Sequence, residues 1–281
     1  MKADVVRILP DGNPRGHPLL KGDQDLALDY AQRCLETGRF QESLQSAREL
    51  IALVEGPRER ERFGRSVLAY VSACGIAAWS LAELGDDAGA LEFLDRGRRV
   101  AVAADDPYSR VVVDVCHGSL LAYHGDAAAA VKILEPAVAT CRDKLFVEWL
   151  MLGLAPLAVA HACLGGGRDG IPLAREAITL HERTGAEANR SYLHLALART
   201  ATIAGELGEA QASACRGLEF AERHQEQGGE AWLRWVLGEV AARRGDAREA
   251  ERCYDDAQDI AESLGMRPLV ERCRLALRQL V

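Results

Sequence analysis

Five glycines recur at intervals of forty residues, and this regular spacing constrains the fold of the chain more strongly than any other feature. Each one directly follows an apolar, alanine-rich stretch; they are Gly85, Gly125, Gly165, Gly205 and Gly245. A fixed period between about 20 and 50 residues is typical of proteins built from stacked structural repeats. The spacing therefore predicts a repeat array.

Three columns of small residues keep the same register as the glycines. Seven residues before each glycine, and again five and twelve residues after it, the chain carries only Ala or Gly. The columns are Ala78, Gly118, Ala158, Ala198 and Gly238; Ala90, Ala130, Gly170, Ala210 and Ala250; and Gly97, Ala137, Ala177, Gly217 and Ala257. Small residues on facing helices let the two axes approach closely while the surrounding leucines interdigitate. The columns therefore predict pairs of antiparallel helices joined at the glycine.

The residues around the glycines carry helix stop and start signals. Asp86, Asp126 and Asp246 each follow a turn glycine, where an aspartate can cap the next helix after a left-handed glycine has ended the previous one. Forty residues accommodate two helices of about 17 residues with short connections. We expect helices near 23–37, 40–54, 58–84, 87–103, 108–124, 127–142, 145–164, 171–184, 187–204, 207–224, 228–244, 247–264 and 268–280.

These helices give one repeat domain. The expected fold is all-α: a right-handed superhelical solenoid of about six helix-turn-helix repeats over residues 23–281, with a C-terminal capping helix. Residues 1–22 are rich in proline and glycine, so we expect a flexible leader or linker there. Gly38 precedes Gly85 by 47 residues, which predicts either a longer first helix or an extra turn in the second unit.

Composition and charge exclude several classes of protein. The chain has 281 residues, of which 48% are hydrophobic, and this is too apolar for a disordered chain. Its formal charge of −8 argues against direct nucleic-acid binding, which needs a basic face. The eight cysteines show no CxxC pair, the first twenty residues hold no apolar run long enough for a signal peptide, and no stretch approaches the length of an apolar membrane helix. We therefore expect a cytoplasmic protein with no membrane contact.

The sequence holds no motif typical of catalysis or metal binding. Gly165, Gly166 and Gly167 are not followed by the lysine of a phosphate-binding loop. Neither His161 with Cys163 nor Cys116 with His117 has a second pair at metal-ligand spacing. We expect no enzyme activity, no cofactor and no metal site.

The pattern of small residues about the turn resembles the tetratricopeptide repeat, although its period is 40 residues where that family has 34. Leu237 and Gly238 match the Leu-Gly step of the family, whereas Arg234 occupies the expected Trp position and Trp235 lies one place later. Longer repeats of this kind are similar to those of maltose-regulator-like transcription activators. The stretch from Gly229 to Leu280 also resembles the C-terminal repeat regions of bacterial multidomain nucleotide cyclase/ATPase proteins. In such proteins the array is the regulatory or partner-sensing part.

This resemblance implies that the first helix of each pair lines a concave inner wall. The positions thirteen, ten, six, three and two before each turn glycine would then face the groove. Trp, Tyr and Arg, the residue types that dominate binding hot spots, gather at the C-terminal end of this wall. The candidate partner-binding residues are Trp79, Glu83, Ser119, Tyr123, Val159, Tyr192, Arg199, Trp232, Trp235, Glu239 and Arg243.

Two functions are compatible with such a wall. The first is a non-catalytic interaction module, a regulatory or scaffolding part of a bacterial signalling or transcription-control assembly that binds a protein or peptide segment in its groove. The alternative is a sensor domain that closes around a small effector or peptide. The sequence assigns neither the partner nor the oligomeric state.

Overall fold

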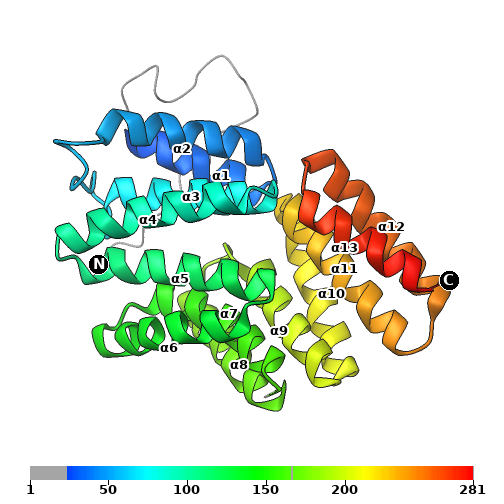
Figure 1. Cartoon of the computed structure of the whole chain (residues 1–281). Coiled ribbons are helices and arrows are strands. Elements are labelled where there is room, and N and C mark those ends of the chain that lie inside the picture. The colour runs from blue at the N-terminus through cyan, green and yellow to red at the C-terminus, as the bar shows by residue number, and fades with distance from the viewer. Residues whose placement is uncertain (1–23, 166, 281) are drawn as a thin grey trace.

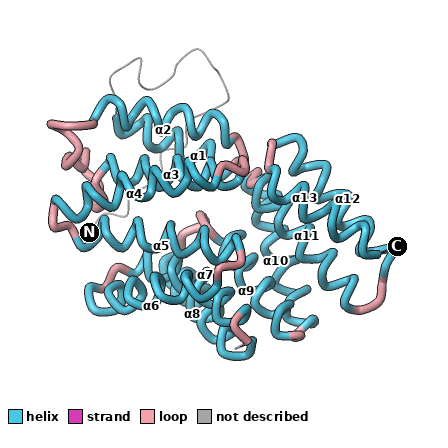
Figure 2. Tube along the Cα trace, viewed as in Figure 1, coloured by secondary structure: helices cyan, strands magenta, loops and turns pink. Residues whose placement is uncertain are grey.

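The computed structural model describes residues 24–165 and 167–280, and within these ranges the chain forms thirteen α-helices and no strand (Figures 1 and 2). This confirms the expected all-α repeat solenoid. The leader expected at residues 1–22 lies outside the described residues. The helices are α1 (Gln24–Glu36), α2 (Phe40–Val54), α3 (Ala69–Glu83), α4 (Asp87–Ala103), α5 (Pro107–His124), α6 (Ala127–Lys144), α7 (Val147–Cys163), α8 (Gly167–Thr184), α9 (Arg190–Ala204), α10 (Leu207–His224), α11 (Gln227–Arg243), α12 (Ala247–Leu264) and α13 (Arg267–Leu280).

All five turn glycines have the conformation that their position predicts. Each has a positive φ, from 80° at Gly205 and Gly245 to 93° at Gly165. Such a left-handed backbone is strained for residues with a Cβ atom. After three of the turns, the side chains of Asp86, Asp126 and Asp246 accept a hydrogen bond from a backbone N–H in the first turn of the next helix. Each of these three turns therefore ends one helix and caps the next.

The helices form an inner and an outer layer. Each odd-numbered helix contacts the next odd-numbered helix, and each even-numbered helix packs on the outside against its two sequence neighbours. The outer helix α12 buries a single stripe, at Ala250, Cys253, Tyr254, Ala257 and Ala261. The inner helix α7 is buried along most of its surface. Helices that are apolar all round belong in a core, and amphipathic helices cover it.

The columns of small residues lie where two helices of a pair meet most closely. A Cβ atom added at Gly118 in α5 would lie 2.3 Å from Leu134 in α6, and one added at Gly238 in α11 would lie 2.5 Å from the ring of Tyr254 in α12. A large residue on the outer helix thus fills the space that the inner glycine leaves. This close fit confirms the packing that the repeat predicts.

The helix expected at 58–84 is wrong in its first part. Residues 55–68 form turns and irregular backbone, and α3 begins only at Ala69. Gly56 and Gly64 have φ values of 82° and 81°, which a continuous helix cannot contain. The longer spacing between Gly38 and Gly85 is therefore taken up by an extended connection.

The array closes on itself. Helix α1 contacts α11, and α13 contacts α3; Figure 1 shows α12 and α13 beside the C-terminal end of α3. The guanidinium of Arg33 in α1 donates a hydrogen bond of 3.1 Å to the backbone carbonyl of His224, across 191 residues of sequence. A Cβ atom added at Gly228 would lie 2.9 Å from the ring of Phe40. The inner helices therefore enclose a space that an open solenoid would leave as a groove.

Candidate functional site

The inner layer surrounds a cavity of about 230 Å³. Its wall comes from α1, α3, α5, α7, α9 and α11, from Phe40 at the start of α2, and from the turns before α9 and α11. Most of the lining is apolar, as in typical small-ligand sites. The apolar lining consists of Leu35, Phe40, Gly75, Ile76, Trp79, Val112, Val115, Cys116, Trp149, Leu152, Leu195, Gly228, Gly229 and Trp232.

Aromatic rings from four inner helices form a continuous cluster beside the cavity. Trp79 meets Tyr123 and Tyr192 edge to face, with ring centroids 6.0 and 5.7 Å apart. Tyr123 meets Trp232 at 5.5 Å, and Trp232 meets Trp235 at 5.9 Å. Edge-to-face pairs at these distances contribute about 0.5–1.5 kcal/mol beyond their buried area. The cluster therefore fixes α3, α5, α9 and α11 relative to one another.

Two arginines lie over the same rings. The Arg199 guanidinium is 4.7 Å from the ring centroid of Tyr123, and that of Arg272 is 5.8 Å from the ring centroid of Trp232. Arg272 also donates a hydrogen bond of 2.8 Å to the carbonyl of Tyr123. Both cations are thus engaged within the wall, and neither belongs to the residues that line the cavity.

Glu83 places a carboxylate at the junction between the cavity and the aromatic cluster. Its Oε2 accepts a hydrogen bond of 3.2 Å from the indole N–H of Trp232. Burial raises the pKa of Glu83 to about 7, although hydrogen bonding from Trp232 and the charge of Arg199 favour the ionised form. This carboxyl group therefore titrates near neutral pH.

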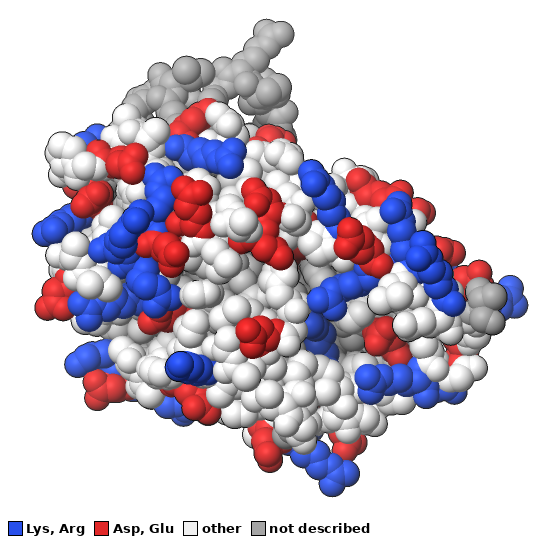
Figure 3. All heavy atoms as spheres, in the orientation of Figure 1, with Lys and Arg blue, Asp and Glu red and all other residues white. Residues whose placement is uncertain are grey.

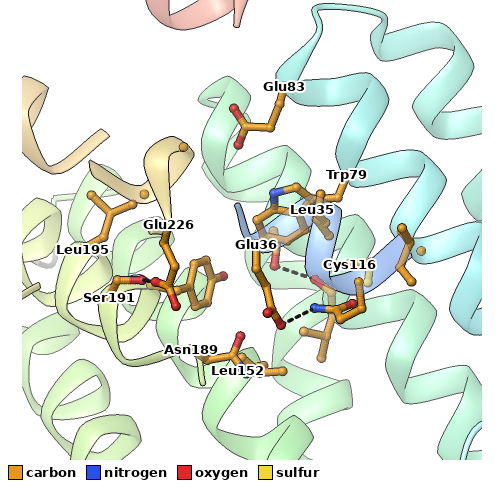
Figure 4. A pocket seen from close by; sticks show the side chains of 18 of the residues that line it. Leu35, Glu36, Trp79, Glu83, Cys116, Leu152, Asn189, Ser191, Leu195 and Glu226 are labelled. Carbon is orange, nitrogen blue, oxygen red and sulfur yellow. Dashed lines mark hydrogen bonds between the residues drawn. The ribbon is translucent and has the colours of Figure 1, made fainter. Parts of the chain in front are cut away.

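Glu36 at the end of α1 and Glu226 in the turn before α11 supply two more carboxylates. Figure 4 shows both side chains directed into the same space, with Asn189 beside them. The Ser191 hydroxyl donates to Glu226, and the Gln32 amide donates to Glu36 at 3.0 Å. Burial raises the pKa of Glu226, and the negative charge of Glu36 acts in the same direction. No Lys, Arg or His occurs among the described residues that line the cavity.

No family model matches the sequence, and no curated protein matches it. The solved structures that resemble it include a Rap protein in complex with competence and sporulation factor. The identity is 11% and the TM-score 0.60, and the match covers 93% of this chain and 79% of the Rap chain. The Rap conjugation gene regulator of plasmid pLS20, in complex with the Phr* peptide, is 13% identical and covers 100% of this chain and 80% of that one, with a TM-score of 0.62. The fold is a tetratricopeptide-like solenoid.

A third structure has a lower TM-score. It is the signal transduction ATPase with numerous domains from Pyrococcus horikoshii, which carries a tetratricopeptide repeat sensor. The identity is 15% and the TM-score 0.50, and the match covers 93% of this chain but only 39% of the ATPase. The likeness concerns the helical-repeat fold, and it confirms the fold that the columns of small residues predict.

The tetratricopeptide-like wall brings together most of the residues that the sequence nominates. Six of the eleven line the cavity: Trp79, Glu83, Ser119, Tyr123, Tyr192 and Trp232. Val159 and Arg199 lie next to them, where they line a hollow of about 10 Å³ together with Tyr123 and Tyr192. These eight positions form one continuous region on α3, α5, α7, α9 and α11.

The other three nominated residues are outside the cavity lining. Trp235 packs against Trp232, and Glu239 accepts a hydrogen bond of 2.7 Å from the Tyr254 hydroxyl in α12. The Arg243 guanidinium donates a hydrogen bond of 2.6 Å to the carbonyl of Thr202 in α9. The contacts of Glu239 and Arg243 connect α11 to α12 and to α9.

Sequence reasoning missed the carboxylates of Glu36 and Glu226 and the amide of Asn189. Glu36 stands two residues before Gly38, the same register that nominates Glu83 before Gly85, so extending the column to the first turn would have found it. Asn189 and Glu226 lie in the second turn of their units, outside every column of the repeat. Only the closure of the array brings Glu226 beside α1.

Several other kinds of site have no support in the described part of the chain. No group of three His, Cys, Asp or Glu side chains in these ranges could hold a metal ion. None of the described helices has the length and apolarity needed to cross a membrane. On the face seen in Figure 3, acidic and basic side chains are interspersed without a broad basic patch.

Proposed function

We propose that this chain is a non-catalytic binding and regulatory module whose closed solenoid holds a short peptide segment or a small effector in its internal cavity. The observation that carries the proposal is the cavity of about 230 Å³ lined mainly by the six inner helices α1, α3, α5, α7, α9 and α11. Contact between α1 and α11 brings the two ends of the inner layer together, so the concave side would not offer an extended partner segment a groove running unobstructed along the whole array. The geometry therefore favours a sensor domain that closes around a small effector or peptide over a module that binds a long protein segment in an open groove.

The size of the cavity limits the ligand. An apolar cavity of about 150 Å³ in another protein accepts benzene. A space of about 230 Å³ therefore accommodates one or two amino-acid residues or a metabolite of similar size. The six nominated residues that line the cavity would contact this ligand, and Trp235, Glu239 and Arg243 would hold the wall in place.

Two of the similar solved structures support a peptide as the ligand. One Rap protein is complexed with competence and sporulation factor, and the other Rap regulator with the Phr* peptide. A ligand that touches both α1 and α11 binds the closed array better than an open one, so it shifts the population toward the closed form. This coupling would give the module its regulatory output. The eight free cysteines fit the reducing cytoplasm that we propose as its location.

Gly229 offers a variant that blocks the cavity without disturbing the backbone. A Cβ atom added at Gly229 would first meet the Ser191 hydroxyl at 3.5 Å, an ordinary contact. Gly229→Leu therefore places a branched side chain into the cavity from α11. Gly208→Leu is the matched control, because Gly208 lies in α10 with no atom within 4 Å of an added Cβ.

The test is a thermal-shift screen of short peptides and metabolites against the wild type and both variants. A ligand that binds only the native state raises Tm, by an amount that grows with the ratio of the ligand concentration to its Kd. We expect at least one compound to stabilise the wild type and Gly208→Leu but not Gly229→Leu. A screen in which every stabilising compound acts equally on all three proteins would contradict the proposed function.

A further inference from the structure

We infer that the cavity selects a ligand carrying a protonated amine on a compact apolar body, and that Glu36 and Glu226 bind the ammonium group. This inference rests on the proposed function, since it names the ligand class of the same cavity. It starts from the charge of the lining, in which Glu36, Glu83 and Glu226 are the ionisable acids and no cationic side chain is present among the described residues.

The cations near the two carboxylates lie outside the cavity lining. Arg33 is 3.6 Å from Glu36, but its side chain is half exposed and also donates to the carbonyl of His224. His224 is 3.6 Å from Glu187. His224 and Arg33 nevertheless oppose the rise in the pKa of Glu226, so the two carboxylates are partly balanced from outside the cavity, while none of the described residues that line the cavity is a cation. Glu226 is buried and Glu36 keeps 27% of its side chain exposed, and two carboxylates in such a site still gain from a cation placed between them.

Neighbouring side chains hold these carboxylates in a fixed position. Gln32 donates to Glu36, and Ser191 donates to Glu226. Asn189 lines the same part of the cavity and makes no capping hydrogen bond with its side chain. An ammonium group carries three N–H donors and no acceptor. One carboxylate oxygen from each of Glu36 and Glu226 and the amide oxygen of Asn189 would provide one acceptor for each of these three donors.

The rest of the cavity suits an apolar body with limited polarity. Ile76, Leu152 and Leu195 line it together with the rings of Trp79 and Trp149. An anionic ligand would face repulsion from three carboxyl groups, and a neutral ligand would leave the remaining repulsion between Glu36 and Glu226 in place. The lining therefore discriminates by charge at one side and by shape at the other.

The hydroxyl of Tyr192 is an independent sign of a missing ligand atom. Tyr192 lines the cavity, and its oxygen is buried without a hydrogen bond of standard geometry among the described residues. Ser119 is close enough to affect the pKa of Tyr192, but the Ser119 hydroxyl donates to the carbonyl of Val115 at 2.7 Å. Buried polar groups are nearly always hydrogen-bonded in native proteins. A polar atom of the ligand would satisfy this hydroxyl.

Isothermal titration calorimetry with matched probes tests the inference. The cationic probes are phenethylamine, phenylalaninamide and the dipeptide amide Leu-Phe-NH2; 2-phenylethanol and phenylacetate are the neutral and anionic counterparts of the first. We expect phenethylamine to bind about tenfold more tightly than 2-phenylethanol, and phenylacetate to bind more weakly than either. The Glu36→Gln/Glu226→Gln variant should bind phenethylamine and 2-phenylethanol equally.

Two controls keep the result interpretable. Glu92→Gln removes an exposed carboxylate on the outer helix α4, and it should leave the preference for the amine unchanged. The double variant keeps both side-chain shapes and removes the repulsion between Glu36 and the buried Glu226, so its far-ultraviolet circular dichroism and Tm should stay close to those of the wild type.

Three results would overturn the inference. The first is that no cationic probe binds the wild type, the second is that the wild type shows no preference for the amine, and the third is that the double variant keeps this preference. Neutral or anionic compounds that bind the wild type but not Gly229→Leu would leave the proposed function standing while refuting the ligand class. The two proposals can therefore fail separately.

Discussion

The indole N–H of Trp232 donates a hydrogen bond to the carboxylate of Glu83 across 149 residues of sequence, at a distance of 3.2 Å. Glu83 ends α3, near the start of the array, and Trp232 lies in α11, near its end. An open solenoid would hold these helices apart. The bond is thus part of the closure, together with the contacts of α1 with α11 and of α13 with α3.

A double-mutant cycle should detect this bond. Trp232→Phe and Glu83→Leu each remove one partner, and we expect their effects on the free energy of unfolding to be non-additive by about 0.5–1.5 kcal/mol. Urea denaturation gives the four required values. Trp235→Phe with Glu83→Leu is the control cycle, because the indole N–H of Trp235 has no hydrogen-bond partner among the described residues. Equal coupling in the two cycles would contradict the bond.

Stability should depend on pH through Glu83. The pKa of Glu83 is raised from about 4.5 when unfolded to about 7 when folded, so the folded state binds more protons between these values. The ionisation of the buried carboxyl therefore costs nothing below about pH 4.5; the cost grows as the pH rises from about 4.5 to about 7 and levels off above that. Glu83→Gln removes the charge, and it should gain stability over the wild type by up to about 3 kcal/mol between pH 5 and pH 8.

The measurement for Glu83 is the difference in unfolding free energy between the two proteins across that range. Glu226 and His194, whose pKa values are also shifted, contribute equally to both proteins and cancel in the difference. A difference that stays constant with pH would show that Glu83 titrates normally.

Two glycine substitutions should act in opposite directions. Gly125→Ala puts a Cβ atom on a residue with φ of 91°, so we expect a loss of about 1 kcal/mol even though an added Cβ meets no atom within 4 Å. Gly208→Ala lies in the helix α10 with equally open surroundings, and it should gain about 0.5–1 kcal/mol. Thermal and urea unfolding of both variants gives the sign directly. The same sign for both would exclude backbone strain at the turn.

The contact between Gly118 and Leu134 should show strong coupling. Gly118→Ala brings a Cβ atom within 2.3 Å of Leu134, and this overpacking should cost about 1–3 kcal/mol. Leu134→Ala alone should cost about 2–5 kcal/mol because Leu134 is fully buried. In the Leu134→Ala background, however, Gly118→Ala should be nearly neutral or stabilising. Additive effects would show that the two helices shift freely apart.

The sequence predicted the parts of the fold that depend on local geometry. A positive φ at a helix end favours glycine, and a close helix crossing requires a small residue. Both requirements therefore place a recognisable residue type at a fixed interval in the sequence. The register of the inner wall follows from the same columns, and six of the eleven nominated residues line the cavity for that reason. The connection before α3 was missed because its turn glycines, Gly56 and Gly64, lie outside the period.

The closure of the array could not be predicted from the sequence. It depends on the sum of small rotations between successive helix pairs, and no single residue encodes that sum. The sequence therefore predicted Glu83 and Trp232 as wall residues, but it did not predict that their side chains meet. The pair of Glu36 and Glu226 was missed for the same reason, since their side chains share a cavity only after the two ends of the array have met.

The contact between the two ends also limits how this gene can change. An open solenoid can gain or lose a whole unit by duplication or deletion, because the new terminal face resembles the old one. Here one additional forty-residue hairpin would push α11 and α13 away from α1 and α3, and the loss of one would leave them out of reach. The contact between the two ends therefore fixes the number of repeats. Natural variants should differ by amino-acid substitutions and not by the duplication or loss of whole repeats.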